Sequence, residues 1–172
     1  MITITNVYRQ KLPALRFIGL RYGDPDRVNG GFGEQWEQWF AEGNFDKIRA
    51  VSTPAEFEDV DAPIGLMRYK EGEDFQYWIG FFCAEESTVP EGFAHVDFPP
   101  SDIGIAWIQG QEYELFMNEM KAEERMKEAG YKTITDDSGA SWFFERYADN
   151  RFMPQQEGDL PILDIGFYVE AE

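Results

Sequence analysis

The segment from residue 89 to residue 110 constrains the fold most strongly, because it contains two strand-like runs separated by a proline step. It reads VPEGFAHVDFPPSDIGIAWIQG. The first run alternates in polarity, two prolines interrupt it, and an apolar stretch then continues to Gly110. Alternating or apolar runs bounded by Pro and Gly are typical of short strands. We therefore expect strands at His95–Phe98 and Ile103–Ile108.

Further strands are expected on both sides of this segment. Aromatic and β-branched residues dominate FQYWIGFFC, which begins at Phe75. This run and the one before it are separated by the polar turn EGED, which favours a hairpin. Turn residues also bound the other apolar runs. The additional strands are predicted at residues 3–9, Ala14–Tyr22, Ile64–Tyr69, Phe75–Ala84 and Leu160–Val169.

The first predicted helix begins near Glu34 and is amphipathic. Trp36, Trp39 and Phe40 are spaced i, i+3, i+4, so they share one helical face. Gly43 is suited to the left-handed conformation that commonly ends a helix. A short second helical piece is expected directly afterwards, at residues 45–51.

The longest predicted helix runs from Gln111 to Ala129 and ends at Gly130. Charged residues occupy one side of it, and apolar residues recur on the other side. The apolar side is predicted to comprise Tyr113, Phe116, Met117, Met120 and Met126.

The order of the predicted elements is strand, helix, hairpin, followed by strand, helix, strand. This order indicates the α+β class, with two halves of βαββ type and a boundary near Gly92. A chain of 172 residues is suited to a single domain, here residues 1–172, with halves at about 1–91 and 92–172. The two halves share no evident sequence identity, so any repeat is one of topology.

The charge balance excludes one class of function. Asp and Glu number 33 against 15 Lys and Arg, which gives a net charge of −18. Nucleic-acid binding relies on neutralising phosphates with Lys and Arg, so direct binding to DNA or RNA is not expected. The charge would instead attract a cationic ligand or a basic protein surface, unless it serves solubility alone.

The sequence predicts a cytoplasmic protein without a metal or cofactor. Cys83 is the only cysteine, and it lies among apolar residues, as a buried structural thiol would. The N-terminus lacks a signal-peptide pattern, and no apolar run approaches the ~20 residues that span a bilayer. His95 is the only histidine, and the acidic loop at Asp24 departs from the EF-hand pattern.

The two central segments resemble the signature of the GyrI-like small-molecule-binding domain. That domain also occurs as the effector-binding module of some multidrug-responsive transcription activators, including AraC-type ones. The resemblance implies two main helices over a shared antiparallel sheet, with a ligand pocket between the halves. It covers nearly the whole chain, and no helix-turn-helix is evident, so we expect the stand-alone form.

Glu145 is the principal candidate for a functional residue. The run Phe144, Glu145, Arg146, Tyr147 resembles the family's Phe-Glu-x-Tyr motif, which implies a glutamate at the bottom of the pocket. Independently of the resemblance, a carboxylate among aromatic rings is partly desolvated, which raises its pKa and favours a cationic guest. The alternative is an exposed glutamate paired with Arg146 or another base.

Aromatic side chains are the candidates for the pocket wall, since Trp and Tyr combine apolar area with a polar tip. The resemblance favours Tyr77, which matches the tyrosine of a Phe-x-Tyr pattern, and Trp107 lies in the strand after the proline step. Core packing is the alternative role for each ring. The candidate ligand-binding residues are Glu145, Tyr77, Trp107, Trp142, Tyr147, Trp39 and Tyr168.

Three functions remain open at this point. The leading hypothesis is a binding protein for hydrophobic, cationic or electrophilic small molecules, serving drug or toxin sensing or sequestration. The resemblance also implies a hydrolase of strained electrophilic toxins, in which Glu145 is the general base and Tyr147 or Tyr77 donates a hydrogen bond. The third function is also implied by the resemblance: an acidic interaction protein that modulates DNA gyrase, as the namesakes of the family do. The sequence does not indicate an oligomeric state.

Overall fold

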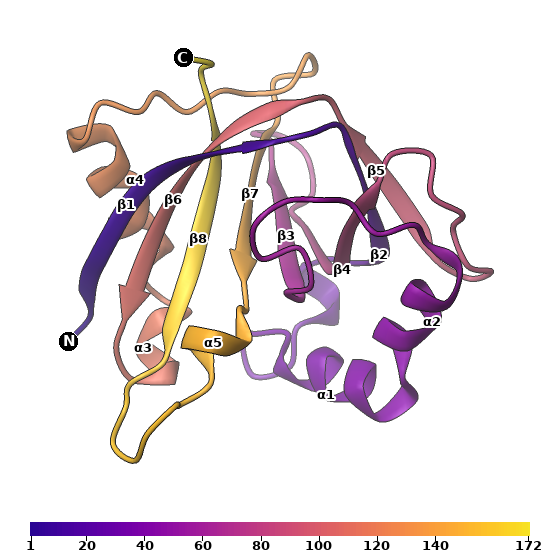
Figure 1. The fold of residues 1–172 in the computed structure, drawn as a ribbon, viewed down its shortest axis with the longest axis horizontal. Helices are drawn as coiled ribbons and strands as arrows, with labels where there is room; N and C mark the ends of the chain where they lie inside the picture. Colours follow the sequence, from indigo (N-terminus) through magenta and orange to yellow (C-terminus); the bar gives the residue numbers. More distant parts are fainter.

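The computed structural model describes residues 1–172 and contains one open, eight-stranded antiparallel sheet with five α-helices (Figure 1). The strands are β1 (Thr3–Leu12), β2 (Leu15–Tyr22), β3 (Ile64–Tyr69), β4 (Gln76–Ala84), β5 (Ala94–Phe98), β6 (Ser101–Gln109), β7 (Ser141–Arg146) and β8 (Ile162–Val169). The helices are α1 (Gly33–Glu42), α2 (Asn44–Val51), α3 (Glu112–Leu115), α4 (Glu119–Glu128) and α5 (Asp149–Phe152), and a 3₁₀ turn, η1, covers Asp24–Asp26.

The sheet is built from two topologically equivalent halves. Its strand order is β1-β6-β8-β7-β3-β4-β2-β5. If each of β1–β4 is replaced by its counterpart among β5–β8, and the reverse, the same order is obtained in the opposite direction. The two halves are therefore related by a pseudo-twofold axis. The first strand of each half pairs with a strand of the other half: β1 pairs with β6, and β5 pairs with β2. The predicted α+β fold with duplicated halves and a shared antiparallel sheet is confirmed.

The two halves meet at the pairing of β3 with β7, in the middle of the sheet. Gly65 lies directly opposite Glu145 in this antiparallel pair. Since successive strand residues point to opposite faces, Phe143 and Glu145 face one side of the sheet, and Phe144 and Arg146 face the other. Glu145 therefore occupies the joint between the halves.

Helices cover one face of the sheet, and each half supplies its own. α1 and α2 pack on β2, β3 and β4 through a buried cluster that contains Trp39, Ile48 and Tyr77. α3 and α4 pack on β6 and β8 through a second cluster that includes Leu115, Met126 and others. In Figure 1 these two groups of helices lie well apart, each beside the strands of its own half. A third cluster, with no residue from a helix, fills the opposite face.

The predicted helix at Gln111–Ala129 is wrong as a continuous element. The chain leaves the helical conformation after α3, and Asn118, at φ −128°, begins α4 anew. This break rotates the buried stripe onto Leu115, Ala122 and Met126. Of the five residues predicted on the apolar side only Met126 is buried, and the exposed four are Tyr113, Phe116, Met117 and Met120.

Other predicted elements agree more closely. The hairpin at Ile64–Tyr69 and Phe75–Ala84 is confirmed as β3 and β4, and Gly43 ends α1 with φ 66°, in the left-handed region. The strand β7 and the helix α5 were not predicted. The sequence of β7, SWFFER, does not alternate between polar and apolar residues, because both faces of this central strand are covered. No helix is long and apolar enough to cross a membrane.

Candidate functional site

Glu145 is a buried carboxyl group on the helix-covered face of the sheet, and only 3% of the residue is exposed. The hydroxyl of Tyr77, on β4, donates a hydrogen bond of 2.7 Å to its Oε1. Trp36, on α1, in turn donates from Nε1 to the Tyr77 hydroxyl at 2.9 Å. The helix of the first half thus orients a tyrosine toward the glutamate of the second half.

The absence of a side chain at Gly65 makes this contact possible. A Cβ atom on Gly65 would lie 2.5 Å from the Tyr77 hydroxyl and 2.6 Å from Oε1 of Glu145. Real Cβ atoms essentially never approach heavy atoms so closely, so any other residue would displace the pair. The glycine opposite Glu145 in the β3–β7 register therefore belongs to the site.

Aromatic rings surround the Tyr77–Glu145 pair. Phe32 stacks on Tyr77 with ring centroids 4.3 Å apart and planes at 4°. Trp36 makes an edge contact with Tyr147, at 4.9 Å between centroids. These rings exclude water from the carboxyl group, which weakens the solvation of its charged form.

A second carboxyl group, from Glu119, reaches the same point from the first turn of α4. It interacts with Glu145 by a side-chain hydrogen bond. Desolvation, and then the negative charge of Glu145, raise the pKa of Glu119 from 4.5 to about 8. The sequence reasoning missed Glu119 because it placed this residue within one long helix, among its charged positions.

Burial also raises the pKa of Glu145, against hydrogen bonds from Tyr77, Tyr147 and Glu119 that favour its ionised form. Burial and the charge of Glu145 hold the pKa of both tyrosines well above 10.0, so both hydroxyls remain donors. We infer that the two carboxyl groups together hold one proton. This proton resides on Glu119, and Glu145 is ionised.

A cavity of about 470 Å³ adjoins Glu119, one of the two carboxyl groups of this pair. Its volume falls within the range of roughly 300–1,000 Å³ that is usual for small-molecule sites. Eight of its twelve lining residues are hydrophobic, and the only charged ones are acidic. The wall comprises Tyr69, Phe75, Glu119, Met120, Glu123, Thr133, Ile134, Ser141, Trp142, Phe143, Phe167 and Tyr168.

The predicted site residues divide into two groups around the cavity. Tyr77 and Tyr147 meet at Glu145, as described above. Trp142 and Tyr168 border the cavity, although both rings also pack against Phe98, at 5.2 Å and 5.1 Å between centroids. Both belong to the cluster on the opposite face of the sheet, so of the predicted aromatic residues only Tyr77 and Tyr147 lie around Glu145.

The two remaining predicted residues lie elsewhere. Trp39 is fully buried in the first-half cluster and donates to the hydroxyl of Tyr22 at 2.9 Å. Trp107 points to the opposite face of the sheet, where its Nε1 donates to the hydroxyl of Tyr8 at 3.2 Å. Neither borders the cavity or contacts Glu145.

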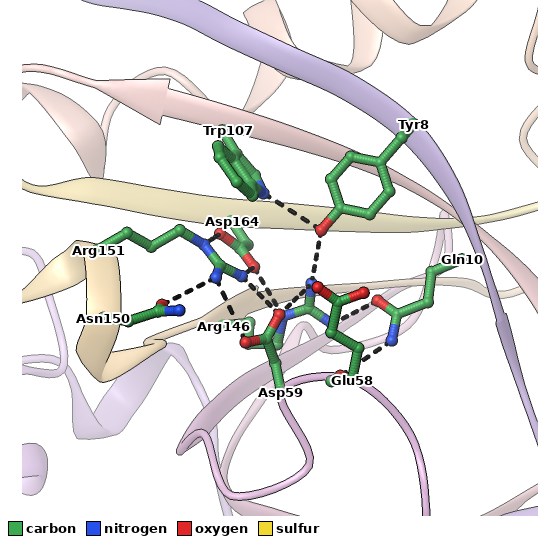
Figure 2. Close-up of polar contacts among 9 residues, drawn as sticks. All are labelled: Tyr8, Gln10, Glu58, Asp59, Trp107, Arg146, Asn150, Arg151 and Asp164. Atoms are coloured by element: carbon green, nitrogen blue, oxygen red, sulfur yellow. Dashed lines mark hydrogen bonds and ion pairs between the residues drawn. The ribbon is translucent and has the colours of Figure 1, made fainter.

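The alternative of an exposed Glu145 paired with Arg146 is wrong, because Arg146 points to the opposite face. There its Nε donates to Asp164 at 2.7 Å, and its Nη1 donates to Gln10 at 2.7 Å. It also forms an ion pair with Asp59 at 3.4 Å. Figure 2 shows these side chains converging on the guanidinium group.

Arg151, from α5, completes this second polar cluster (Figure 2). It forms ion pairs with both Asp59 and Asp164. The guanidinium of Arg151 also lies 4.6 Å from the ring centroid of Trp107. Two arginines thus face two aspartates, and the cluster is electrically balanced.

The residues present no grouping suited to a metal ion. No three His, Cys, Asp or Glu side chains are gathered so that they could hold one.

No sequence-family profile matches the chain, and no curated protein matches it. Several solved structures share its fold. SAV2435 bound to tetraphenylphosphonium superposes with a TM-score of 0.63 at 17% identity, over 97% of this chain and 95% of that one. A Staphylococcus aureus MU50 protein assigned to transcription regulation gives 0.61 at 16% identity, over 96% and 99%. The C-terminal domain of EcmrR gives 0.59 at 14% identity, over 97% and 98%.

These likenesses establish the fold. The matched chains are spanned almost completely, so the whole sheet with its two groups of helices corresponds to their architecture.

Proposed function

We propose that this chain is a small-molecule-binding domain that takes up hydrophobic cations in the cavity beside Glu119 and Glu145. The observation that carries the proposal is the composition of that cavity. Its wall is mostly apolar and aromatic, its only charged residues are Glu119 and Glu123, and a buried carboxylate lies directly behind one of them.

This composition favours a lipophilic cation over a neutral or anionic guest. Aromatic faces contribute about 0.5–2 kcal/mol for each good contact with a cation. Acidic groups in a poorly solvated site attract positive charge more strongly than they would in water. A relative of the same fold, SAV2435, is bound to tetraphenylphosphonium, which has this character.

Titration with tetraphenylphosphonium, followed by calorimetry and by Trp fluorescence, tests the proposal. We expect saturable binding to one site. We also expect Glu145→Gln, which removes the buried charge and keeps the shape, to weaken the affinity at least tenfold, or by about 1.4 kcal/mol. Glu128→Gln is the matched control, since it makes the same change on an exposed position of α4.

A neutral guest of similar shape, triphenylphosphine oxide, separates charge from size. If it binds as tightly as the cation, or if Glu145→Gln binds the cation with unchanged affinity, then the acidic groups do not select the ligand. The folded state of each variant is checked by thermal melting before affinities are compared.

Hydrolysis of a strained electrophile is a second candidate function, favoured by the Tyr77 hydroxyl 2.7 Å from the Glu145 carboxyl group beside the cavity. An ionised Glu145 would accept a proton from an attacking water while the water oxygen bonds to a carbon of the strained ring and the ring C–C bond breaks, leaving its electron pair on the conjugated carbonyl group of the electrophile. The hydroxyl of Tyr77 would turn from Glu145 to donate a hydrogen bond to that carbonyl oxygen, and the proton taken up by Glu145 would pass to it. We expect turnover of a cyclopropane-bearing electrophile that is lost in both Glu145→Gln and Tyr77→Phe. Equal product formation by wild type and variants would exclude this role.

A further inference from the structure

We propose that a cation entering the cavity displaces a proton, and that Glu119 is the residue that exchanges one for the other. This inference deepens the proposed function and rests on it. The geometric observation that carries it is that Glu119 borders the cavity, and the interaction of the same side chain with the buried Glu145 supports it.

Glu119 is placed to be a link between the ligand space and the buried anion. Glu145 is not itself part of the cavity wall, whereas Glu119 and, one turn further along α4, Glu123 are. A guest therefore meets Glu119 before it can influence Glu145. The charge of a bound cation therefore acts most strongly on the carboxyl group of Glu119, and on Glu145 only behind it.

The contact between the two carboxyls requires a proton in the empty protein. Two carboxylates in contact at a poorly solvated site cannot both be ionised without a large repulsion. Glu145 already accepts a hydrogen bond from Tyr77, and both Tyr77 and Tyr147 favour its anionic form. The proton consequently resides mainly on Glu119, whose pKa is raised to about 8.

The other groups around Glu119 leave this proton in place. Tyr77 and Tyr147 remain neutral because burial holds their pKa values well above 10.0. Glu123 is engaged with Lys127 at 3.1 Å.

Arg27 is the one cation whose field lowers the pKa of Glu119. Its guanidinium is occupied elsewhere, in an ion pair with Asp24 at 2.8 Å and over the rings of Phe32 and Phe75. The carboxyl pair therefore has no ion-pair partner of its own, and it lacks the compensating charge that a cationic ligand would bring.

The exchange balances as a simple proton transfer. A cation beside Glu119 stabilises its carboxylate, the O–H bond of the carboxyl group breaks, and the proton passes to the solvent. By linkage, the affinity for the cation rises with pH while Glu119 is protonated in the free protein. The rise is at most about tenfold per pH unit below about pH 8 and levels off above it.

Calorimetric titration of the wild-type protein with tetraphenylphosphonium, in buffers of different ionisation enthalpy, measures the protons released. We expect close to one proton per cation at about pH 7 and nearly none well above pH 8. The infrared absorption of a protonated carboxyl group should decrease on addition of the cation. This second measurement needs no variant.

Two matched variants locate the proton. Glu119→Gln should still bind the cation but should release no proton, and its affinity should be nearly independent of pH. Glu123→Gln removes a charge from the same cavity wall, so it should weaken binding and keep both the proton release and the pH dependence. Proton release that survives in Glu119→Gln, or that is lost in Glu123→Gln, overturns the assignment to Glu119.

The two levels of the proposal fail in different ways. If neither the wild type nor any variant binds tetraphenylphosphonium, the proposed function and this inference are both overturned. If the wild type binds it with a constant affinity between about pH 6 and about pH 8 and releases no proton, the inference alone is overturned.

Discussion

Glu145 and Arg146 are adjacent in the sequence, yet they lie at the centres of two different polar clusters. The cluster around Glu145 has unbalanced charges, and the cluster around Arg146 has balanced charges. On the helix-covered face, Glu145 meets Glu119 and tyrosine hydroxyls, and neither carboxyl group forms an ion pair. On the other face, Arg146 and a second arginine meet Asp59 and Asp164, and the charges balance. The first cluster adjoins a cavity, whereas the second is closed by its own hydrogen bonds.

The difference indicates how each cluster is used. A buried charge is tolerated when it is paired and hydrogen-bonded, and a balanced network of this kind serves to join elements of the fold. The Arg146 cluster joins β1, β7, β8, α5 and the loop before β3. An unbalanced carboxyl pair stabilises nothing of this sort, and perturbed carboxyls beside a cavity are typical of functional sites.

The largest expected effect comes from breaking the balanced cluster. Arg146→Met should lower the free energy of unfolding by about 3–5 kcal/mol, because it leaves the fully buried Asp164 facing only one arginine. Urea denaturation near neutral pH measures this. Arg16→Met is the matched control, since Arg16 pairs with a half-exposed Asp97 on the sheet edge and should cost less than about 1 kcal/mol.

If Arg16→Met and Arg146→Met lower the free energy of unfolding by similar amounts, the balanced cluster stabilises the fold no more than an exposed ion pair does. The comparison between the two faces would then lose its basis.

The unbalanced cluster should reduce stability as the pH rises. The pKa of Glu119 is 4.5 in an ordinary environment and about 8 in the folded chain, so the unfolded chain binds fewer protons over that interval. Stability associated with Glu119 is therefore present below about pH 4.5 and is lost as the pH rises toward 8. Since Glu119 is only partly buried, the expected loss is about 1–3 kcal/mol.

The difference in unfolding free energy between wild type and Glu119→Gln, followed from about pH 5 to about pH 8, isolates this contribution. The variant should gain on the wild type as the pH rises. A constant difference would show that Glu119 is ionised throughout.

The sequence predicted the surroundings of Arg146 less well than the surroundings of Glu145. Short-range signals identified the β3–β4 hairpin and the end of α1 at Gly43, and the resemblance to a family motif singled out Glu145. Arg146 was named only as an alternative partner for Glu145, because nothing local indicates that a loop aspartate and a residue of β8 reach it from the other face. Contacts of that kind depend on strand order.

Glu119 illustrates the same limit within the site. The spacing of Tyr113, Met117 and Met120 predicted one continuous helix, in which residue 119 counts as solvated. The break at Asn118 changed the phase and turned Glu119 toward Glu145. A single non-helical residue therefore decided the position of a residue that we place at the centre of the proposed function.

Gly65→Ala tests the geometry of the unbalanced cluster directly. The added methyl group would occupy the space of the Tyr77 hydroxyl and of Glu145 Oε1, so one of the two side chains has to move. We expect a loss of about 1–3 kcal/mol in unfolding free energy, together with weaker binding of tetraphenylphosphonium. Gly33→Ala, at a position with open space around its Cβ, should leave both unchanged. Unaltered binding by Gly65→Ala would separate the Tyr77–Glu145 contact from ligand recognition.

The smallest expected effects come from removing one phenol hydroxyl from each cluster. Tyr8→Phe takes an acceptor from Arg146 and Trp107, and Tyr77→Phe takes a donor from Glu145 and an acceptor from Trp36. Each change should cost about 1 kcal/mol of unfolding free energy, which is the usual net value of a buried hydrogen bond. Only Tyr77→Phe should alter the binding of tetraphenylphosphonium and its pH dependence, because it raises the pKa of Glu145 further. Equal effects of both variants on binding would mean that the two faces of the sheet are coupled, and that their separate roles need revision.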